Sequence, residues 1–153
     1  QMAKATSIIA NRGEIIKPRL FKGSREFNSS EFTYSEPIIQ GKLDIQQEWF
    51  DFVIDAMEEV NKSGTASRVF GNARYPIAGK TGTAQVFTIK QDEEYDSEKI
   101  PDRLKDHSLY IGFAPVDKPK IAVAVVVENG GFGVTTATPI AKLVFDYYLA
   151  KIR

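Results

Sequence analysis

The sequence predicts an α+β fold, in which helices pack against an antiparallel sheet formed late in the chain. Before residue 63, apolar residues recur at helical spacing. After residue 75, segments rich in β-branched and aromatic residues dominate, and the short connection between two of them predicts a hairpin. One further helix follows the last strand. The order is therefore helices, then strands, then a helix, without the strand–helix alternation of a parallel sheet.

Three segments carry helical patterns. Residues 2–12 predict a short helix ended by Gly13, which suits a left-handed C-cap. Asp44, with Gln47 three residues later as in a capping box, opens the strongest helix, which ends at Ser63-Gly64. The last helix begins at Thr138-Pro139, an N-cap followed by proline. The predicted buried stripes are Met2, Ala5, Ile8 and Ile9; Trp49, Phe50, Val53, Ile54, Met57 and Val60; and Ile140, Leu143, Val144 and Tyr147.

The predicted strands follow the second helix. Residues 75–89 are rich in β-branched and aromatic side chains and predict the first strand. Residues 108–116 and 121–128, joined by a short polar turn, predict a hairpin. Because residues 121–127 are apolar on both faces, we expect this strand to be central in its sheet. Residues 22–42 predict a connecting loop with at most short strands.

Composition excludes several classes of function. The formal net charge is zero, so no basic excess indicates binding to nucleic acid or an anionic membrane. Cysteine is absent and His107 is the single histidine, which excludes disulfides and multi-histidine metal sites within the chain. No stretch is long and apolar enough to span a bilayer, and no cofactor is expected. The helical pattern begins at the first residues, and no residue precedes them as an N-cap, so we expect the chain to start within a domain.

The most informative motif is the run Ala78-Gly79-Lys80-Thr81-Gly82-Thr83-Ala84. A phosphate loop would need glycine at Arg74 and a helix after the lysine, whereas a strand-like segment follows here. The competing interpretation is the Lys-Thr-Gly motif of serine acyl-enzymes that act on penicillins and D-alanyl peptides. On a strand edge, Lys80 would supply positive charge, and the hydroxyls of Thr81 and Thr83 could bind a substrate carboxylate. Gly82 would leave room for a substrate backbone.

Several further runs, in matching order and spacing, resemble class B penicillin-binding proteins over nearly the whole chain. They are Gln1-Met2-Ala3-Lys4-Ala5, the Trp49 helix leading to Ser63-Gly64-Thr65-Ala66, the Lys-Thr-Gly segment up to Val86, Asp106-His107-Ser108-Leu109 leading to Gly112-Phe113-Ala114-Pro115, and Val125 to Gly131. Residues 94–107 most resemble the elongation group, penicillin-binding protein 2 of Gram-negative bacteria. The resemblance implies that residues 1–153 are the C-terminal portion of a penicillin-binding, β-lactamase-like transpeptidase domain. Its sheet should keep only the last three strands.

The resemblance also implies a mechanism. In that family a serine of Ser-x-x-Lys attacks a D-alanine carbonyl of a peptidoglycan stem peptide, and β-lactams acylate the same serine. Ser-x-Asn assists proton transfer, and Lys-Thr-Gly closes the site, which assigns the catalytic positions Lys80, Thr81, Gly82 and Thr83 here. None of the nine serines has lysine three residues on or asparagine two residues on. We therefore expect the catalytic half to lie upstream, and the fragment itself to be inactive.

The parent protein is accordingly expected to be a serine-type D-Ala-D-Ala transpeptidase in the periplasm, anchored in the inner membrane by an N-terminal segment absent from this chain. Implied partners are peptidoglycan stem peptides, β-lactam antibiotics and a membrane glycosyltransferase of the elongation machinery. The alternative is a non-catalytic module that senses β-lactams or binds within a cell-wall complex. Because strands missing beside residues 121–127 would leave an apolar edge, we also expect self-association.

Four remaining features have structural interpretations. His107 predicts a loop or strand-edge residue that makes one hydrogen bond. Residues 129–133 predict a turn in preference to a cleft wall. Residues 90–107 predict a solvated charged loop in preference to a cover over a substrate groove. The run Ser63-Gly64-Thr65-Ala66 is expected to end a helix.

Overall fold

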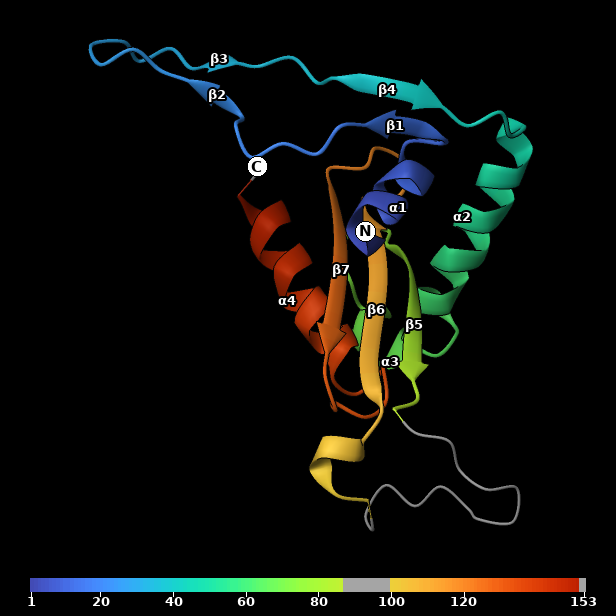
Figure 1. Ribbon diagram of the computed structural model, residues 1–153. Helices are drawn as coiled ribbons and strands as arrows, with labels where there is room; N and C mark the ends of the chain where they lie inside the picture. The colour runs from blue at the N-terminus through green and yellow to red at the C-terminus, as the bar shows by residue number, and fades with distance from the viewer. Residues whose placement is uncertain (87–99, 152–153) are drawn as a thin grey trace.

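The computed structural model describes residues 1–86 and 100–151, and a three-stranded antiparallel sheet forms its centre (Figure 1). The strands β5 (Ala78–Ala84), β6 (His107–Ala114) and β7 (Ile121–Val127) lie in the order β5-β6-β7. Together with the surrounding helices, this sheet confirms the predicted α+β class. The predicted strand residues 87–89 and the loop residues 90–99 lie outside the described part.

Helices cover both faces of the sheet. They are α1 (Met2–Ala10), α2 (Gln47–Lys62), the short α3 (Ser67–Phe70) and α4 (Ala137–Ala150), with a 3-10 turn η1 (Asp102–Leu104) before β6. On one face, residues of α1 and α2 such as Ile54 pack around Phe113 of β6. On the other face, Phe70 of α3 and Phe145 of α4 pack around Tyr110, also of β6. The sheet is therefore buried between two apolar layers.

The segment between α1 and α2 forms short strands only, as predicted. β1 (Glu14–Ile16) pairs with β4 (Ile39–Lys42), and β2 (Gly23–Ser24) pairs with β3 (Thr33–Tyr34). In Figure 1 the β2–β3 hairpin extends away from the central sheet. Gly13, at φ +94°, makes the left-handed turn that the sequence predicted after α1.

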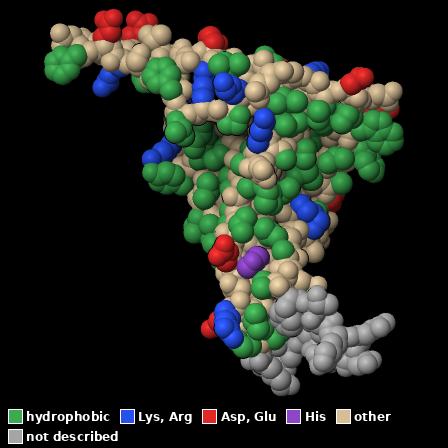
Figure 2. Space-filling view, in the orientation of Figure 1, with side chains coloured by type: hydrophobic (Ala, Val, Ile, Leu, Met, Phe, Trp, Pro, Cys, Tyr) green, Lys and Arg blue, Asp and Glu red, His purple; other side chains and the backbone are tan. Residues whose placement is uncertain are grey.

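The buried stripe of α2 differs from the predicted one. Its buried residues are Phe50, Ile54, Met57 and Asn61, whereas Trp49 and Val53 are 57% and 42% exposed. Because α2 packs mainly along the edge strand β5, it buries one narrow stripe at i, i+4, i+7 and i+11, and residues one position earlier turn outward. Figure 2 shows the resulting hydrophobic side chains gathered over α2. The predicted N-cap Asp44 was also wrong, since Gln46 occupies that position.

The predicted face of α1 was right in part and that of α4 was wrong. In α1, Ile8 and Ile9 are half-buried, and Ile9 packs against the core. Met2 and Ala5 are exposed, whereas the buried residues are Thr6 and Ala10. The buried residues of α4 are Ala137, Thr138, Ala141 and Phe145, whereas the predicted stripe of Ile140, Leu143, Val144 and Tyr147 is 39–70% exposed. Small residues let α4 approach the sheet closely. The helix starts at Ala137, with Thr136 as N-cap in place of the predicted Thr138.

The hairpin prediction is confirmed, but the position of its second strand is not. β6 pairs with β7 from Ser108 opposite Val127 to Ala114 opposite Ile121. In the described part, β7 pairs with β6 alone, so β6 is central and β7 lies at the edge. The apolar pattern of residues 121–127 predicted burial on both faces, but it carried no information about neighbours on either side.

None of the helices in residues 1–86 and 100–151 is long and apolar enough to cross a membrane.

Candidate functional site

All four predicted site residues lie on β5, an edge strand. β5 pairs with β6 from Ala78 opposite Phe113 to Ala84 opposite His107, and its other edge has no strand partner within the described residues. An edge strand without a strand partner can receive an extended peptide by strand addition. Alternation along the strand places Thr81 and Thr83 on one face.

The two threonine hydroxyls have different partners. Thr83 Oγ1 accepts a hydrogen bond from the backbone N–H of Gly133 at 3.3 Å, so its own proton is free to donate elsewhere. Thr81 Oγ1 lies 3.2 Å from Thr65 Oγ1, with either atom able to donate. Two residues of strand separate the hydroxyls by about 7 Å. This face of β5 therefore carries two hydroxyls, and both can donate to one anionic group when Thr65 is the donor to Thr81.

The ammonium group of Lys80 is exposed. Its Nζ donates to the backbone carbonyl of Thr81 at 2.8 Å, which folds the side chain back along its own strand. Within residues 1–86 and 100–151, no carboxylate forms an ion pair with Lys80. The positive charge therefore lies at the strand edge without an acidic partner there, where an anionic ligand could approach it.

Two glycines let other segments approach β5 closely. A Cβ added to Gly79 would lie 2.0 Å from the Tyr110 hydroxyl oxygen, so only glycine leaves room for that ring. A Cβ on Gly133 would lie 2.3 Å from the carbonyl oxygen of Gly82. Neither role could be predicted from the sequence, because each depends on a contact with a distant segment. Among the described residues, a Cβ added at Gly82 would meet only Leu109, 3.2 Å away.

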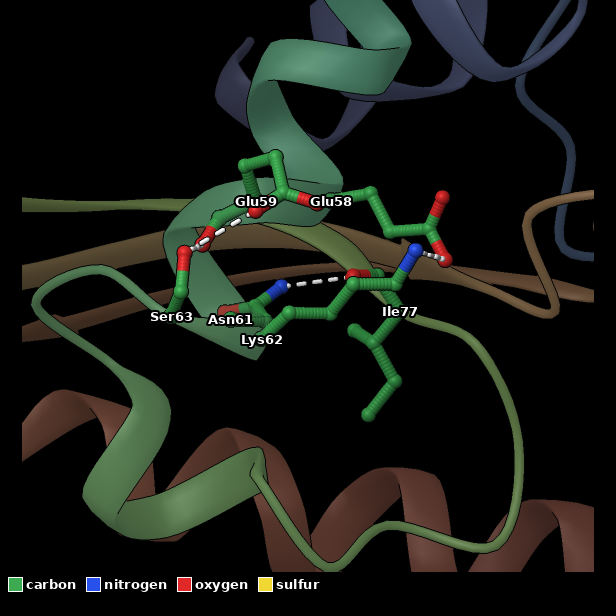
Figure 3. A network of polar contacts seen from close by, with 6 residues as sticks. All are labelled: Glu58, Glu59, Asn61, Lys62, Ser63 and Ile77. Carbon is green, nitrogen blue, oxygen red and sulfur yellow. Dashed lines mark hydrogen bonds and ion pairs between the residues drawn. The ribbon is translucent and has the colours of Figure 1, made fainter.

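A buried asparagine anchors the beginning of β5 to the end of α2. Asn61 Nδ2 donates to the carbonyl of Ile77 at 2.8 Å (Figure 3), and the Tyr110 hydroxyl donates to Asn61 Oδ1 at 3.2 Å. Asn61 is 3% exposed and Tyr110 is fully buried. Burial raises the pKa of the Tyr110 hydroxyl, which therefore remains a proton donor. Sequence reasoning missed Asn61, although a polar residue continuing the spacing of a buried stripe was the available signal.

The turn after β7 is tied to the start of β6. The backbone N–H of Asn129 donates to His107 Nδ1 at 2.9 Å, which confirms the predicted single hydrogen bond at the strand edge. The Asn129 side chain donates to the carbonyls of Arg103 and Lys105 at 3.0 and 2.9 Å. Asn129 has φ +54°, as a tight turn requires. The predicted turn is confirmed, and its end at Gly133 also lies against β5.

Two cavities lie away from the hydroxyls of β5. One, of about 350 Å³, lies between the end of α2 and residues 70–77, and the other, of about 670 Å³, lies beside Arg74, Lys120 and Asp146. Neither is lined by Lys80, Thr81 or Thr83. These two cavities are therefore separate from the hydroxyl face of β5.

A hydrogen bond from Tyr75 to Asp146 joins the segment before β5 to α4, and Asp146 also forms an ion pair within α4. The Tyr75 hydroxyl and Lys142 Nζ each donate to a carboxylate oxygen of Asp146 at 2.6 Å. Burial alone would raise the pKa of Asp146, but the hydrogen bonds from Lys142 and Tyr75 lower it below its ordinary value. Burial also raises the pKa of Tyr75. The bond between Tyr75 and Asp146 holds the segment that precedes β5 against α4.

Comparison with known proteins identifies the class of domain to which this fold and strand edge belong. The family described as the penicillin binding protein transpeptidase domain matches residues 1–146. The chain therefore belongs to that family, which confirms the resemblance found in the sequence and the predicted fold.

Among curated relatives, the chain is 36% identical to the peptidoglycan D,D-transpeptidase MrdA of Haemophilus influenzae over 97% of its length and 23% of that protein. It is 42% identical to MrdA of Acinetobacter baumannii over 97% of its length and 22% of that protein. The chain thus spans less than a quarter of these relatives.

Solved structures agree with this assignment. The chain superposes on penicillin-binding protein 2 of Pseudomonas aeruginosa, in complex with WCK 5153, with a TM-score of 0.72 and 34% identity over 96% of this chain and 29% of that one. It also superposes on penicillin-binding protein A of M. tuberculosis, a ceftriaxone acyl-enzyme complex. There the TM-score is 0.69 with 27% identity, over 94% of this chain and 30% of that one.

Proposed function

We propose that the chain is the C-terminal part of a serine-type D-Ala-D-Ala transpeptidase domain, which cross-links peptidoglycan stem peptides and is acylated by β-lactams. The observation that carries the proposal is the run Lys80-Thr81-Gly82-Thr83 on the open edge of β5, in a chain of this family. Relatives named D,D-transpeptidases favour this enzyme over a non-catalytic sensing module. Because those relatives are more than four times as long as the matched segment, the activity is proposed for the parent protein.

Each residue of the run has a proposed role. A substrate peptide would add to β5 as a further strand, and Gly82 would let its backbone approach. The hydroxyls of Thr81 and Thr83 would donate to the substrate carboxylate, and Lys80 would add positive charge beside the reacting centre. The nucleophilic serine of Ser-x-x-Lys, and Ser-x-Asn, would come from residues outside the 153 of this chain, since none of its serines fits either motif.

We further propose that the parent protein acts in the periplasm, held by an N-terminal membrane segment, beside a membrane glycosyltransferase. The support is the resemblance of residues 94–107 to the elongation group and the MrdA relatives from Gram-negative species. Fractionation of cells that express the tagged full-length protein tests the location. Recovery in the cytoplasmic fraction would contradict it.

The isolated fragment is proposed to self-associate through β7. This strand pairs on one side in the described part, and its Val126 is 53% exposed. An unpaired apolar strand edge is a template for pairing with a second chain. Sedimentation velocity over a concentration series should show association of the fragment, whereas a monomer at all concentrations would contradict the proposal.

Covalent labelling with a fluorescent penicillin, read on a denaturing gel, tests the proposed activity. We expect the full-length protein to be labelled and the 153-residue fragment to remain unlabelled. In the full-length protein, Lys80→Ala should slow labelling by about a hundredfold or more, as expected for loss of a charge that stabilises the reacting centre. Lys120→Ala removes an exposed lysine that directly precedes β7, at the opposite edge of the sheet from β5, and serves as the matched control. Absence of labelling in both proteins would contradict the enzymatic proposal.

A further inference from the structure

The run Ser63-Gly64-Thr65-Ala66 does more than end α2. The helix is closed by backbone bonds, from Ser63 N–H and Gly64 N–H to the carbonyl of Glu59 at 3.0 and 2.9 Å. None of these bonds uses the side chain of Thr65. Its hydroxyl instead reaches across to β5 and lies 3.2 Å from the hydroxyl of Thr81.

Thr65 is held firmly on both sides of its position. After it, the N–H of Ala66 donates to the carbonyl of Val60 at 3.0 Å, and Ala66 is fully buried. Before it, Gly64 lies so close to α2 that an added Cβ would be 2.9 Å from the Cα of Val60. The peptide around Thr65 therefore has little freedom to move away from β5.

The partner strand is fixed to the same end of α2. Asn61, one turn before Thr65, donates to the carbonyl of Ile77 near the start of β5 (Figure 3). The buried bond at Asn61 and the hydroxyl contact at Thr65 thus join the end of α2 to β5 on either side of Lys80. Both hydroxyls of the Thr65–Thr81 pair are consequently carried by backbone that is held in place.

A threonine hydroxyl has one proton to donate. If Thr81 donated to Thr65, it would have none left for an anion. If Thr65 donates, the Thr81 proton is directed away from Thr65, and the incoming bond polarises Thr81 as a stronger donor. We propose that Thr65 is a positioning residue that donates to Thr81 and reserves the Thr81 proton for the substrate carboxylate. This inference rests on the proposed transpeptidase function, because it needs an anionic ligand at β5.

The test measures acylation of the full-length protein by benzylpenicillin, which carries a carboxylate, and by its neutral methyl ester. Thr65→Val keeps the shape of the side chain but removes the hydroxyl. We expect this variant to lower the second-order acylation constant for benzylpenicillin about tenfold, because a hydrogen bond to a charged group is weakened. The constant for the methyl ester should stay within about twofold, because a neutral group gains little from a directed proton.

Two matched variants separate positioning from folding. Thr65→Ser keeps the hydroxyl and should restore the benzylpenicillin constant. Ser63→Ala removes a hydroxyl two residues away, whose hydrogen bonds within residues 1–86 and 100–151 both go to Glu59 (Figure 3), and should leave both constants unchanged. In a Thr81→Val background, Thr65→Val should cause no further loss, because the two residues act through one proton.

The outcomes are distinct. An equal fall for the acid and the ester in Thr65→Val, or no fall for either, would overturn the positioning role while leaving the transpeptidase proposal intact. A tenfold fall in Thr65→Val that Thr65→Ser fails to restore would also overturn it. If neither compound acylates the unmodified full-length protein, the proposed function itself is overturned, and this inference with it.

Discussion

Replacement of Asn61 by alanine should destabilise the chain more than any exposed polar substitution. Asn61→Ala leaves two buried groups without partners, the carbonyl of Ile77 and the hydroxyl of Tyr110. Each unsatisfied buried group costs about 1–3 kcal/mol, and the higher helix propensity of alanine offsets about 0.6 kcal/mol. We therefore expect the free energy of unfolding to fall by about 3 kcal/mol.

Urea unfolding followed by far-ultraviolet circular dichroism measures this change, provided that the free energy of unfolding falls with urea concentration at the same slope, the m-value, in all variants. Asn72→Ala replaces an exposed asparagine and is the matched control, with an expected change within about 0.5 kcal/mol. In the double variant Asn61→Ala/Tyr110→Phe the unpaired hydroxyl is absent. The free energy of unfolding should therefore fall in the double variant by about 1 kcal/mol less than the sum of the falls in Asn61→Ala and Tyr110→Phe.

A loss below about 1 kcal/mol in Asn61→Ala would refute the argument that a buried asparagine anchors β5 to α2. Strict additivity in the double variant would show that Tyr110 and Asn61 are not coupled. Either result would also weaken the argument that the end of α2 fixes the position of the Lys80 strand.

Two further predictions concern residues around β5. Gly79→Ala places a methyl group 2.0 Å from the Tyr110 hydroxyl oxygen and should cost about 2–4 kcal/mol in urea unfolding; a neutral effect would show that the ring can move aside. Asp146→Asn should cost up to about 1 kcal/mol at pH 7, since the carboxylate is partly exposed. Because Lys142 and Tyr75 lower the pKa of Asp146, this stabilisation is present above the unfolded pKa of about 4 and is lost as pH falls through the lower folded value. A difference between wild type and variant that grows below pH 4 would contradict this sign.

Local chemistry in the sequence was sufficient for the three longer helices, the three strands of the central sheet and their order, whereas the short helix α3 was not predicted. Gly13 predicted the end of α1, Ser63-Gly64 predicted the end of α2, and the turn near Asn129 followed from its glycines. These signals work because turns and helix ends depend on the conformational range of the residues that form them. The predicted cap at Asp44 failed because the chain remains extended up to Gln46 before α2 begins.

Helix faces were harder to predict than helices. α4 is apolar nearly all round, so periodicity alone could not select between its faces, and the large residues that were favoured, such as Leu143, point outward. The face that packs carries Ala137 and Ala141, because small side chains let the helix lie close to the sheet. In α2, Trp49 is exposed because the helix packs mainly along the edge strand β5 and buries one narrow stripe.

The sequence by itself determined which residues of the proposed site stand together. Lys80, Thr81, Gly82 and Thr83 are adjacent in the chain, so their order on a strand follows from the local sequence alone. The tertiary structure decided which distant residues support them. Asn61 and Thr65 reach β5 only after α2 has packed against the sheet. No local pattern encodes such contacts, because they depend on the distance between segments that packing alone brings together.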